Sequence, residues 1–125
     1  SSNVLTTQSL VINLFAFYYI YYIIIYMTEN NTFGDAIEAL KLGKRVARKN
    51  WNGKNMFLFL LPEGTGIPTK VIHDPALREV IETEVGSDTF DAHGSIRMFT
   101  ADKKILTGWL ASQTDMLSED WTIFN

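Results

Sequence analysis

The stretch TFGDAIEALKLGKRVARKNWNGKNMFLFL, residues 32–60, decides the fold of this chain. It opens with a helix signature, because Thr32 can cap a helix and Asp35, three residues later, completes a capping box. The apolar residues that follow recur at the i, i+3, i+4, i+7 spacing of a single helix face. Gly43 stands where a helix C-terminus favours a residue of positive φ. We therefore predict an amphipathic helix over residues 32–42.

Short strands are predicted around and beyond this helix. A strand begins at Arg45, NWNG at residues 50–53 is typical of a tight hairpin turn, and MFLFLL at residues 56–61 predicts a central strand covered on both faces. A second helix is expected from Asp74-Pro75 to Gly86, with loops at residues 63–66 and 87–94. Strands at 95–100, 105–110 and 121–124 and a capped helical turn at 112–118 complete the chain. The predicted fold class is α+β, a small antiparallel sheet with one main helix packed on it and a second helix in the middle segment.

The N-terminal segment has a different composition from the rest. Residues 10–27, LVINLFAFYYIYYIIIYM, carry no charge. Three interpretations stay open: an added or upstream-translated extension with Met27 as the native start, a membrane span, or a β-strand or packing arm. No Lys or Arg precedes the run and its tyrosines lie in the middle, so membrane association is not expected. The β-branched and aromatic composition favours a strand over a helix. We predict an extension at 1–26 and one domain at 27–125.

Composition excludes several function classes. The formal charge is −3, which argues against a general nucleic-acid binder, although six of the eleven basic residues lie between Lys41 and Lys54. The absence of cysteine rules out disulfides and thiolate zinc sites, and the two histidines are twenty residues apart. The chain contains no phosphate-binding glycine motif and no arrangement typical of a nucleophilic triad. We predict no catalytic residues, no metal and no cofactor.

Two clusters have the chemistry of a nucleotide site. RKNWNGK at residues 48–54 combines an indole, cations and amides, and WLASQTD at residues 109–115 adds a second indole, hydroxyls and a carboxylate. Nucleotides are bound by such groups, because bases stack on aromatic rings, phosphates pair with cations, and amides bind base edges and ribose. The alternative is that Trp51 and Trp109 fill the core, the cations are solvated, and Ser112 and Asp115 cap a short helix.

The same two regions carry a family resemblance. Residues 32–60 and WLASQTDMLSEDW at residues 109–121 resemble the small phage-encoded Thoeris anti-defence proteins of the second type, the Tad-two-like family. The resemblance implies a phage protein that acts in the cytoplasm of the infected bacterium and sequesters glycocyclic ADP-ribose, the signal of TIR-domain enzymes, without cleaving it. Some members also hold cyclic dinucleotides of CBASS defence. The family implies a homotetramer with pockets between subunits.

Carried onto this chain, the resemblance assigns ligand binding to Phe33, Arg48, Trp51, Asn52, Lys54, Trp109, Ser112, Gln113, Thr114 and Asp115. Trp51, with Phe33, would stack on the purine, and Arg48 and Lys54 would serve the phosphates. The amide, hydroxyl and carboxylate side chains would serve ribose and base edges. Residues 62–93 depart from the family pattern, which leaves the choice of ligand open. Two other hypotheses are a protein–protein module that blocks a host defence enzyme and a phosphodiesterase-like enzyme.

Overall fold

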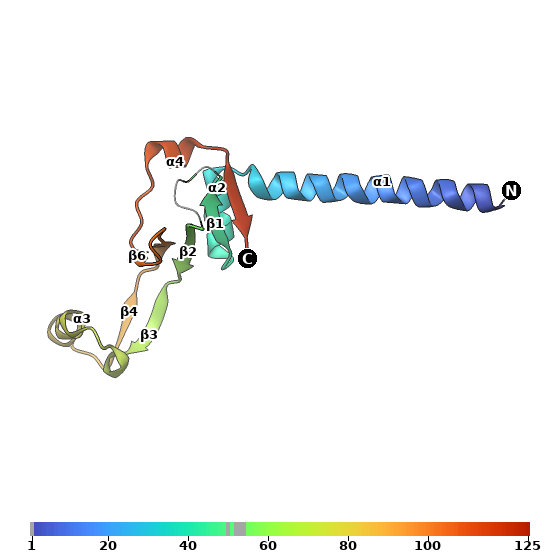
Figure 1. The fold of residues 1–125 in the computed structure, drawn as a ribbon. Helices are drawn as coiled ribbons and strands as arrows, with labels where there is room; N and C mark the ends of the chain where they lie inside the picture. The colour runs from blue at the N-terminus through green and yellow to red at the C-terminus, as the bar shows by residue number, and fades with distance from the viewer. Residues whose placement is uncertain (1, 50, 52–54) are drawn as a thin grey trace.

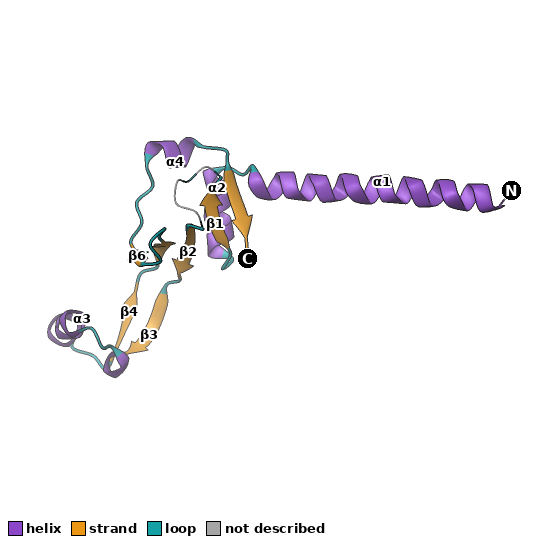
Figure 2. Cartoon of the chain, viewed as in Figure 1, coloured by secondary structure: helices purple, strands orange, loops and turns teal. Residues whose placement is uncertain are grey.

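The body of the protein is a sheet with one helix on it. The structure, a computed structural model, describes residues 2–49, 51 and 55–125. In this part of the chain, an antiparallel five-stranded sheet has the order β6-β5-β2-β1-β7, and α2 lies against it (Figures 1 and 2). The elements are α2 (Phe33–Lys41), β1 (Arg45–Arg48), β2 (Phe57–Leu61), β5 (Ser95–Phe99), β6 (Ile105–Thr107), α4 (Gln113–Leu117) and β7 (Trp121–Phe124). The α+β prediction is confirmed.

The predicted signals at both ends of α2 are confirmed. The Asp35 backbone N–H donates to the Thr32 hydroxyl over 3.1 Å, and the Thr32 N–H donates to the Asp35 carboxylate over 3.0 Å. This capping box satisfies donors that the first helical turn cannot pair internally. Gly43 follows the helix with a φ of +83°, a conformation that glycine adopts without strain. The chain can therefore reverse directly into β1.

The core lies between α2 and one face of the sheet. It consists of Ala36, Ala39, Leu40, Val46, Leu58, Met98 and Trp121. β2 is central, as predicted, and its residue Leu58 faces this core. The prediction that β2 is covered on both faces is wrong, because its alternate residues Phe57 and Phe59 are only half-buried and point away from α2.

Aromatic and cationic side chains occupy this second face, which we call the Phe–Arg face. It comprises Phe57, Phe59, Phe99, Arg45 and Arg97. The rings of Phe57 and Phe99 stack with centroids 5.1 Å apart. The Arg45 guanidinium lies 4.5 Å from the Phe57 ring centroid, and that of Arg97 lies 4.4 Å from the Phe59 centroid. Cation–π contacts shield these rings only in part, so the Phe–Arg face leaves apolar surface in water.

The middle segment forms an arm that continues from β2 and returns to β5. Its strands β3 (Gly64–Pro68) and β4 (Thr89–Ala92) pair antiparallel, and between them lie a 3-10 turn (Thr69–Val71), α3 (Pro75–Val80) and a π-helical turn (Ile81–Val85). Figure 1 shows this arm extending away from the sheet. The predicted helix from Asp74-Pro75 to Gly86 is confirmed. The loops predicted at 63–66 and 87–94 are wrong, because these segments supply the two strands that pair with each other.

The N-terminal segment is a single long helix, α1 (Ser2–Glu29). The prediction of a strand is wrong. An isolated strand leaves its backbone N–H and C=O groups unpaired, whereas a helix pairs them within the segment, and neither Gly nor Pro interrupts it. β-propensity reflects packing against neighbouring strands, and α1 projects away from the sheet (Figure 1).

The tight turn predicted at residues 50–53 lies outside the described residues, except for Trp51. β1 ends at Arg48 and β2 begins at Phe57, so the connection between them is longer than a two-residue hairpin loop.

Candidate functional site

Four aromatic rings bring the two motif regions together. Trp121 is fully buried, and around its ring lie Phe33 at 5.5 Å, Trp51 at 5.6 Å and Trp109 at 6.2 Å between centroids. Trp51 and Trp109 also contact each other, with centroids 6.2 Å apart. The three outer rings are half-buried, so each packs on the core with one part and meets solvent with another. They are thus both core-packed and partly available to a ligand.

Arg48 is held between two carboxylates. Its Nη1 lies 3.0 Å from Asp115 Oδ1 and its Nε lies 3.0 Å from Asp120 Oδ1. The side chain is 18% exposed, and Asp115 and Asp120 are 14% and 25% exposed. Hydrogen bonds to Asp120 and then to Asp115 raise the pKa of Arg48 above its ordinary value. The guanidinium therefore fastens the end of β1 to α4 and to the start of β7.

Asp115 links the ion pair to the aromatic cluster. Its carboxylate accepts a hydrogen bond from the Ser112 N–H over 3.0 Å, and its N–H donates to the Ser112 hydroxyl over 3.0 Å, which is a second capping box. Its carbonyl accepts a bond from Trp121 Nε1 at 2.9 Å. Burial opposes ionisation of Asp115, but hydrogen bonds from the Ser112 backbone and Arg48 outweigh burial and lower the pKa of Asp115. The residue is charged at neutral pH.

The remaining predicted site residues have separate positions. Gln113 and Thr114 lie exposed on α4, and Ser112 is the N-cap of that helix. Asn52 and Lys54 lie outside the described residues. The structure thus brings together Phe33, Trp51, Trp109, Arg48 and Asp115, but the charged groups of the last two are directed at each other.

A pocket of about 440 Å³ adjoins Trp51 and Arg48. It is lined by Glu29, Ala47, Arg48, Lys49, Trp51, Asn55, Met56, Thr122 and Phe124. The volume is within the range of pockets that hold small molecules, about 300–1,000 Å³. We call it the Trp51 pocket. Its described lining includes Trp51 and Lys49, but no residue of the 109–115 region.

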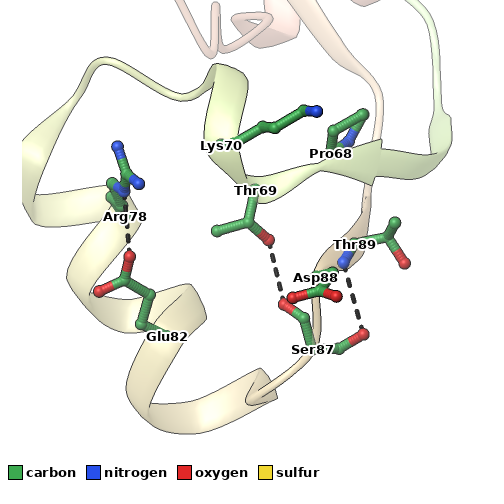
Figure 3. Close-up of a pocket in the computed structure, with 8 residues that line it drawn as sticks. All are labelled: Pro68, Thr69, Lys70, Arg78, Glu82, Ser87, Asp88 and Thr89. Atoms are coloured by element: carbon green, nitrogen blue, oxygen red, sulfur yellow. Dashed lines mark hydrogen bonds and ion pairs between the residues drawn. The ribbon is translucent and has the colours of Figure 1, made fainter.

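A second pocket, of about 580 Å³, lies in the arm (Figure 3). Its lining is polar, with Arg78 and Glu82 ion-paired at 3.0 Å and the Thr69 hydroxyl donating to the Ser87 carbonyl at 3.1 Å. None of the residues predicted to bind ligand lines it. Among the lining side chains, the charges of Lys70 and Arg78 are matched by those of Glu82 and Asp88, so this pocket does not select for an anion. We therefore place the candidate site at the Trp51 pocket.

The ligand-binding residues predicted from the sequence omit two residues of the site, although one of them, Lys49, lies in the RKNWNGK cluster. Lys49 lies 3.7 Å from Glu29, in an exposed ion pair that a ligand can replace at low cost. Asp120 is the second partner of Arg48. The EDW sequence contains Asp120, but only the register of β1 against β7, which pairs Arg48 with Trp121, brings it to the guanidinium. Within the described part of the chain, no three His, Asp or Glu side chains gather as metal ligands would.

Fold and site define a small α+β domain with an aromatic and ion-paired centre. A protein-family model described as the Thoeris anti-defense 2-like domain matches residues 31–124. The chain is also 38% identical over 104 residues to the protein named Thoeris anti-defense 2 of Bacillus phage SP01, a match that covers 78% of this chain and 98% of that protein. The chain belongs to the Thoeris anti-defense 2-like family, and the resemblance found in the sequence is confirmed.

Proposed function

We propose that this protein counters Thoeris defence in the cytoplasm of an infected bacterium by binding a cyclic nucleotide signal, glycocyclic ADP-ribose, and holding it uncleaved. Family membership supports the defence system, since the related phage protein is named for anti-Thoeris activity. The observation that carries the choice of ligand class is the Trp51 pocket, where an indole and a cation line one cavity. A protein that binds the signal tightly and is abundant lowers its free concentration by mass action.

Trp51 and Lys49 are the groups that act on the ligand in this proposal. The exposed part of the Trp51 ring offers a stacking surface for the purine, and its buried part, packed on Trp121, keeps the ring from turning. Lys49 supplies a phosphate contact. Arg48 acts as a positioning residue, because its guanidinium already binds two carboxylates. Lys54, Asn52, Gln113 and Thr114 stay predicted contacts to phosphate, ribose and base.

The proposal includes an oligomer, with the homotetramer of the family as its expected form. The Trp51 pocket lacks the polar side chains of the 109–115 region, so a neighbouring subunit is the natural source of further contacts. The Phe–Arg face is a suitable subunit contact, because burying stacked Phe57 and Phe99 removes apolar surface from water. On this face Arg97 Nε is also buried without a hydrogen-bond partner among the described atoms.

The test is to incubate the protein with glycocyclic ADP-ribose, remove free ligand, denature the protein by heat and analyse what is released. Intact ligand is the expected result. Altered ligand would show an enzyme, and no ligand would favour the module that blocks a host enzyme. A parallel incubation with a cyclic dinucleotide tests whether CBASS signals are also held. Trp51→Ala should release at least tenfold less ligand, whereas Lys41→Ala, on the exposed side of α2, should match the parent protein.

A further inference from the structure

From residue 10 to residue 27, α1 has an apolar surface on all sides and is exposed. Glu29 is the first charged residue of the chain, so the preceding residues of the helix carry none. Residues 6–29 form a 24-residue stretch that contains an 18-residue window with a mean hydropathy of 1.9, and no residue of that window is buried against the rest of the protein. Figure 1 shows the helix projecting from the sheet as a free rod. Such a surface needs a partner that covers it from every direction.

The dimensions identify that partner. At 1.5 Å per residue, the 24-residue stretch spans about 36 Å and its 18-residue apolar window about 27 Å, a length that suits the ~30 Å hydrocarbon core of a phospholipid bilayer. A helix that docks in a protein groove or lies on a membrane surface has a polar side for water, and α1 has no such side. A bilayer surrounds the helix completely, and helical backbone groups need no external hydrogen bonds there.

The distribution of basic residues gives an orientation. Residues 30–49, which follow α1, hold Lys41, Lys44, Arg45, Arg48 and Lys49, while residues 1–9 hold no Lys or Arg. Positive charge close to a span is retained on the cytoplasmic side. The globular domain would therefore stay in the cytoplasm, where a soluble nucleotide signal is accessible. The five tyrosines lie between residues 18 and 26, in the half of the helix adjoining the domain.

The junction between α1 and the domain is short and is held by hydrogen bonds. Asn31 pairs with Trp121 through two backbone hydrogen bonds, Asn31 N to Trp121 O at 3.0 Å and Trp121 N to Asn31 O at 3.1 Å. Lys49 on the domain lies 3.7 Å from Glu29 at the end of α1. Glu29 also lines the Trp51 pocket, so the helix end and the ligand pocket are adjacent.

We propose that α1 is a single membrane-spanning anchor that inserts into the phospholipid bilayer and holds the domain, with the Trp51 pocket next to the bilayer surface, on the cytoplasmic face. The related phage protein is matched over 98% of its length by 78% of this chain, and the family model begins at residue 31, so α1 lies outside the matched domain. The anchor is thus separate from the proposed ligand binding, and either proposal can fail alone.

The test uses the full chain with a C-terminal fluorescent reporter in bacteria. We expect at least 90% of it to float with membrane vesicles on a density gradient and to resist extraction by alkaline carbonate, whereas aggregates would sediment. Fluorescence, together with a lack of activity when alkaline phosphatase replaces the reporter, would establish a cytoplasmic domain. The paired substitution Phe17→Arg and Ile20→Arg, in the middle of the span, should move most of the protein to the soluble fraction and leave ligand release unchanged. Leu42→Arg, at a 75% exposed site on the domain, is the matched control and should still float.

Three results would overturn the proposal. One is a parent chain in the soluble or carbonate-extracted fraction, and another is equal flotation of the doubly substituted chain. The third comes from mass spectrometry of protein expressed from the gene with its own upstream sequence: chains that all start at Met27 would show that α1 is not made.

Discussion

Arg48→Met separates a positioning role for Arg48 from direct ligand binding. Methionine keeps much of the aliphatic stem but removes the charge that neutralises Asp115 and Asp120, which are 14% and 25% exposed. Removing one partner of a fully buried ion pair costs about 3–5 kcal/mol, and the partial exposure of these carboxylates reduces the expected loss to about 2–3 kcal/mol. For a domain of this size, each kcal/mol corresponds to roughly 4–8 °C in Tm, so we expect a decrease of about 10–20 °C.

Urea unfolding at pH 7, followed by tryptophan fluorescence and circular dichroism, measures this loss. Lys49→Met is the matched control, because its ion pair with Glu29 is long and exposed and should contribute less than about 1 kcal/mol. Arg48→Met should release ligand in proportion to its folded fraction, whereas Lys49→Met should keep its stability and lose affinity. A positioning role for Arg48 would be refuted if Arg48→Met retained its stability within about 0.5 kcal/mol but bound no ligand.

Three further changes test individual contacts. The pKa of Asp115 is lower in the folded protein than in the unfolded chain. The stability that ionised Asp115 contributes is therefore complete above the ordinary pKa of about 3.9 and is lost as the pH falls through the folded-state pKa. Asp115→Asn should flatten the acid limb of a plot of unfolding free energy against pH. Gly43→Ala should lower the free energy of unfolding by about 1 kcal/mol. The loss comes from backbone strain at a φ of +83°, since no atom lies near enough to clash with the added methyl group, and an unchanged Tm would contradict it. Trp51→Phe should keep most ligand release in the denaturation assay, since a ring remains, and loss equal to that of Trp51→Ala would mean that stacking is not its role.

The elements that sequence predicts correctly depend on local interactions. Both capping boxes span four residues, so the hydroxyl and carboxylate that form each one are recognisable in a line of sequence. The positive φ at Gly43 is likewise a local requirement. β2 is recognised because an apolar run of that length suits a central strand, although the run does not show which face is covered.

The failures depend on distant partners. β3 contains Gly64, Gly66 and Pro68, residues that are uncommon in strands, and it forms only because β4 returns beside it, with a shift of register in the pairing. Sequence also suggested that Arg48 was available to a phosphate. Arg48 is instead bound to Asp115 and Asp120, which lie 67 and 72 residues away along the chain. The position of α4 and the pairing of β1 with β7 bring these carboxylates to it.

The failure at α1 has a different cause. Ile, Tyr and Phe favour strands in sheets because neighbouring strands and a packed face reward their shape. Without a partner strand this preference has no physical basis, and internal pairing of the backbone decides in favour of the helix. The helix leaves its apolar side chains exposed, which is unfavourable in water. A bilayer therefore suits the helix better than water does, a conclusion that the prediction of a strand did not suggest.

The charge balance at the site limits how a single subunit can hold an anionic ligand. Arg48 carries one positive charge and is paired with two carboxylates, so the group of three is net negative at neutral pH. Lys49 offsets this charge within the Trp51 pocket, but Glu29 lies in the same lining. A ligand with two phosphates therefore requires further cations beyond these described lining residues. In our proposal these further cations come from Lys54 and from a neighbouring subunit. Subunit assembly would then be required for tight ligand binding, and the uncovered Phe–Arg face would drive that assembly.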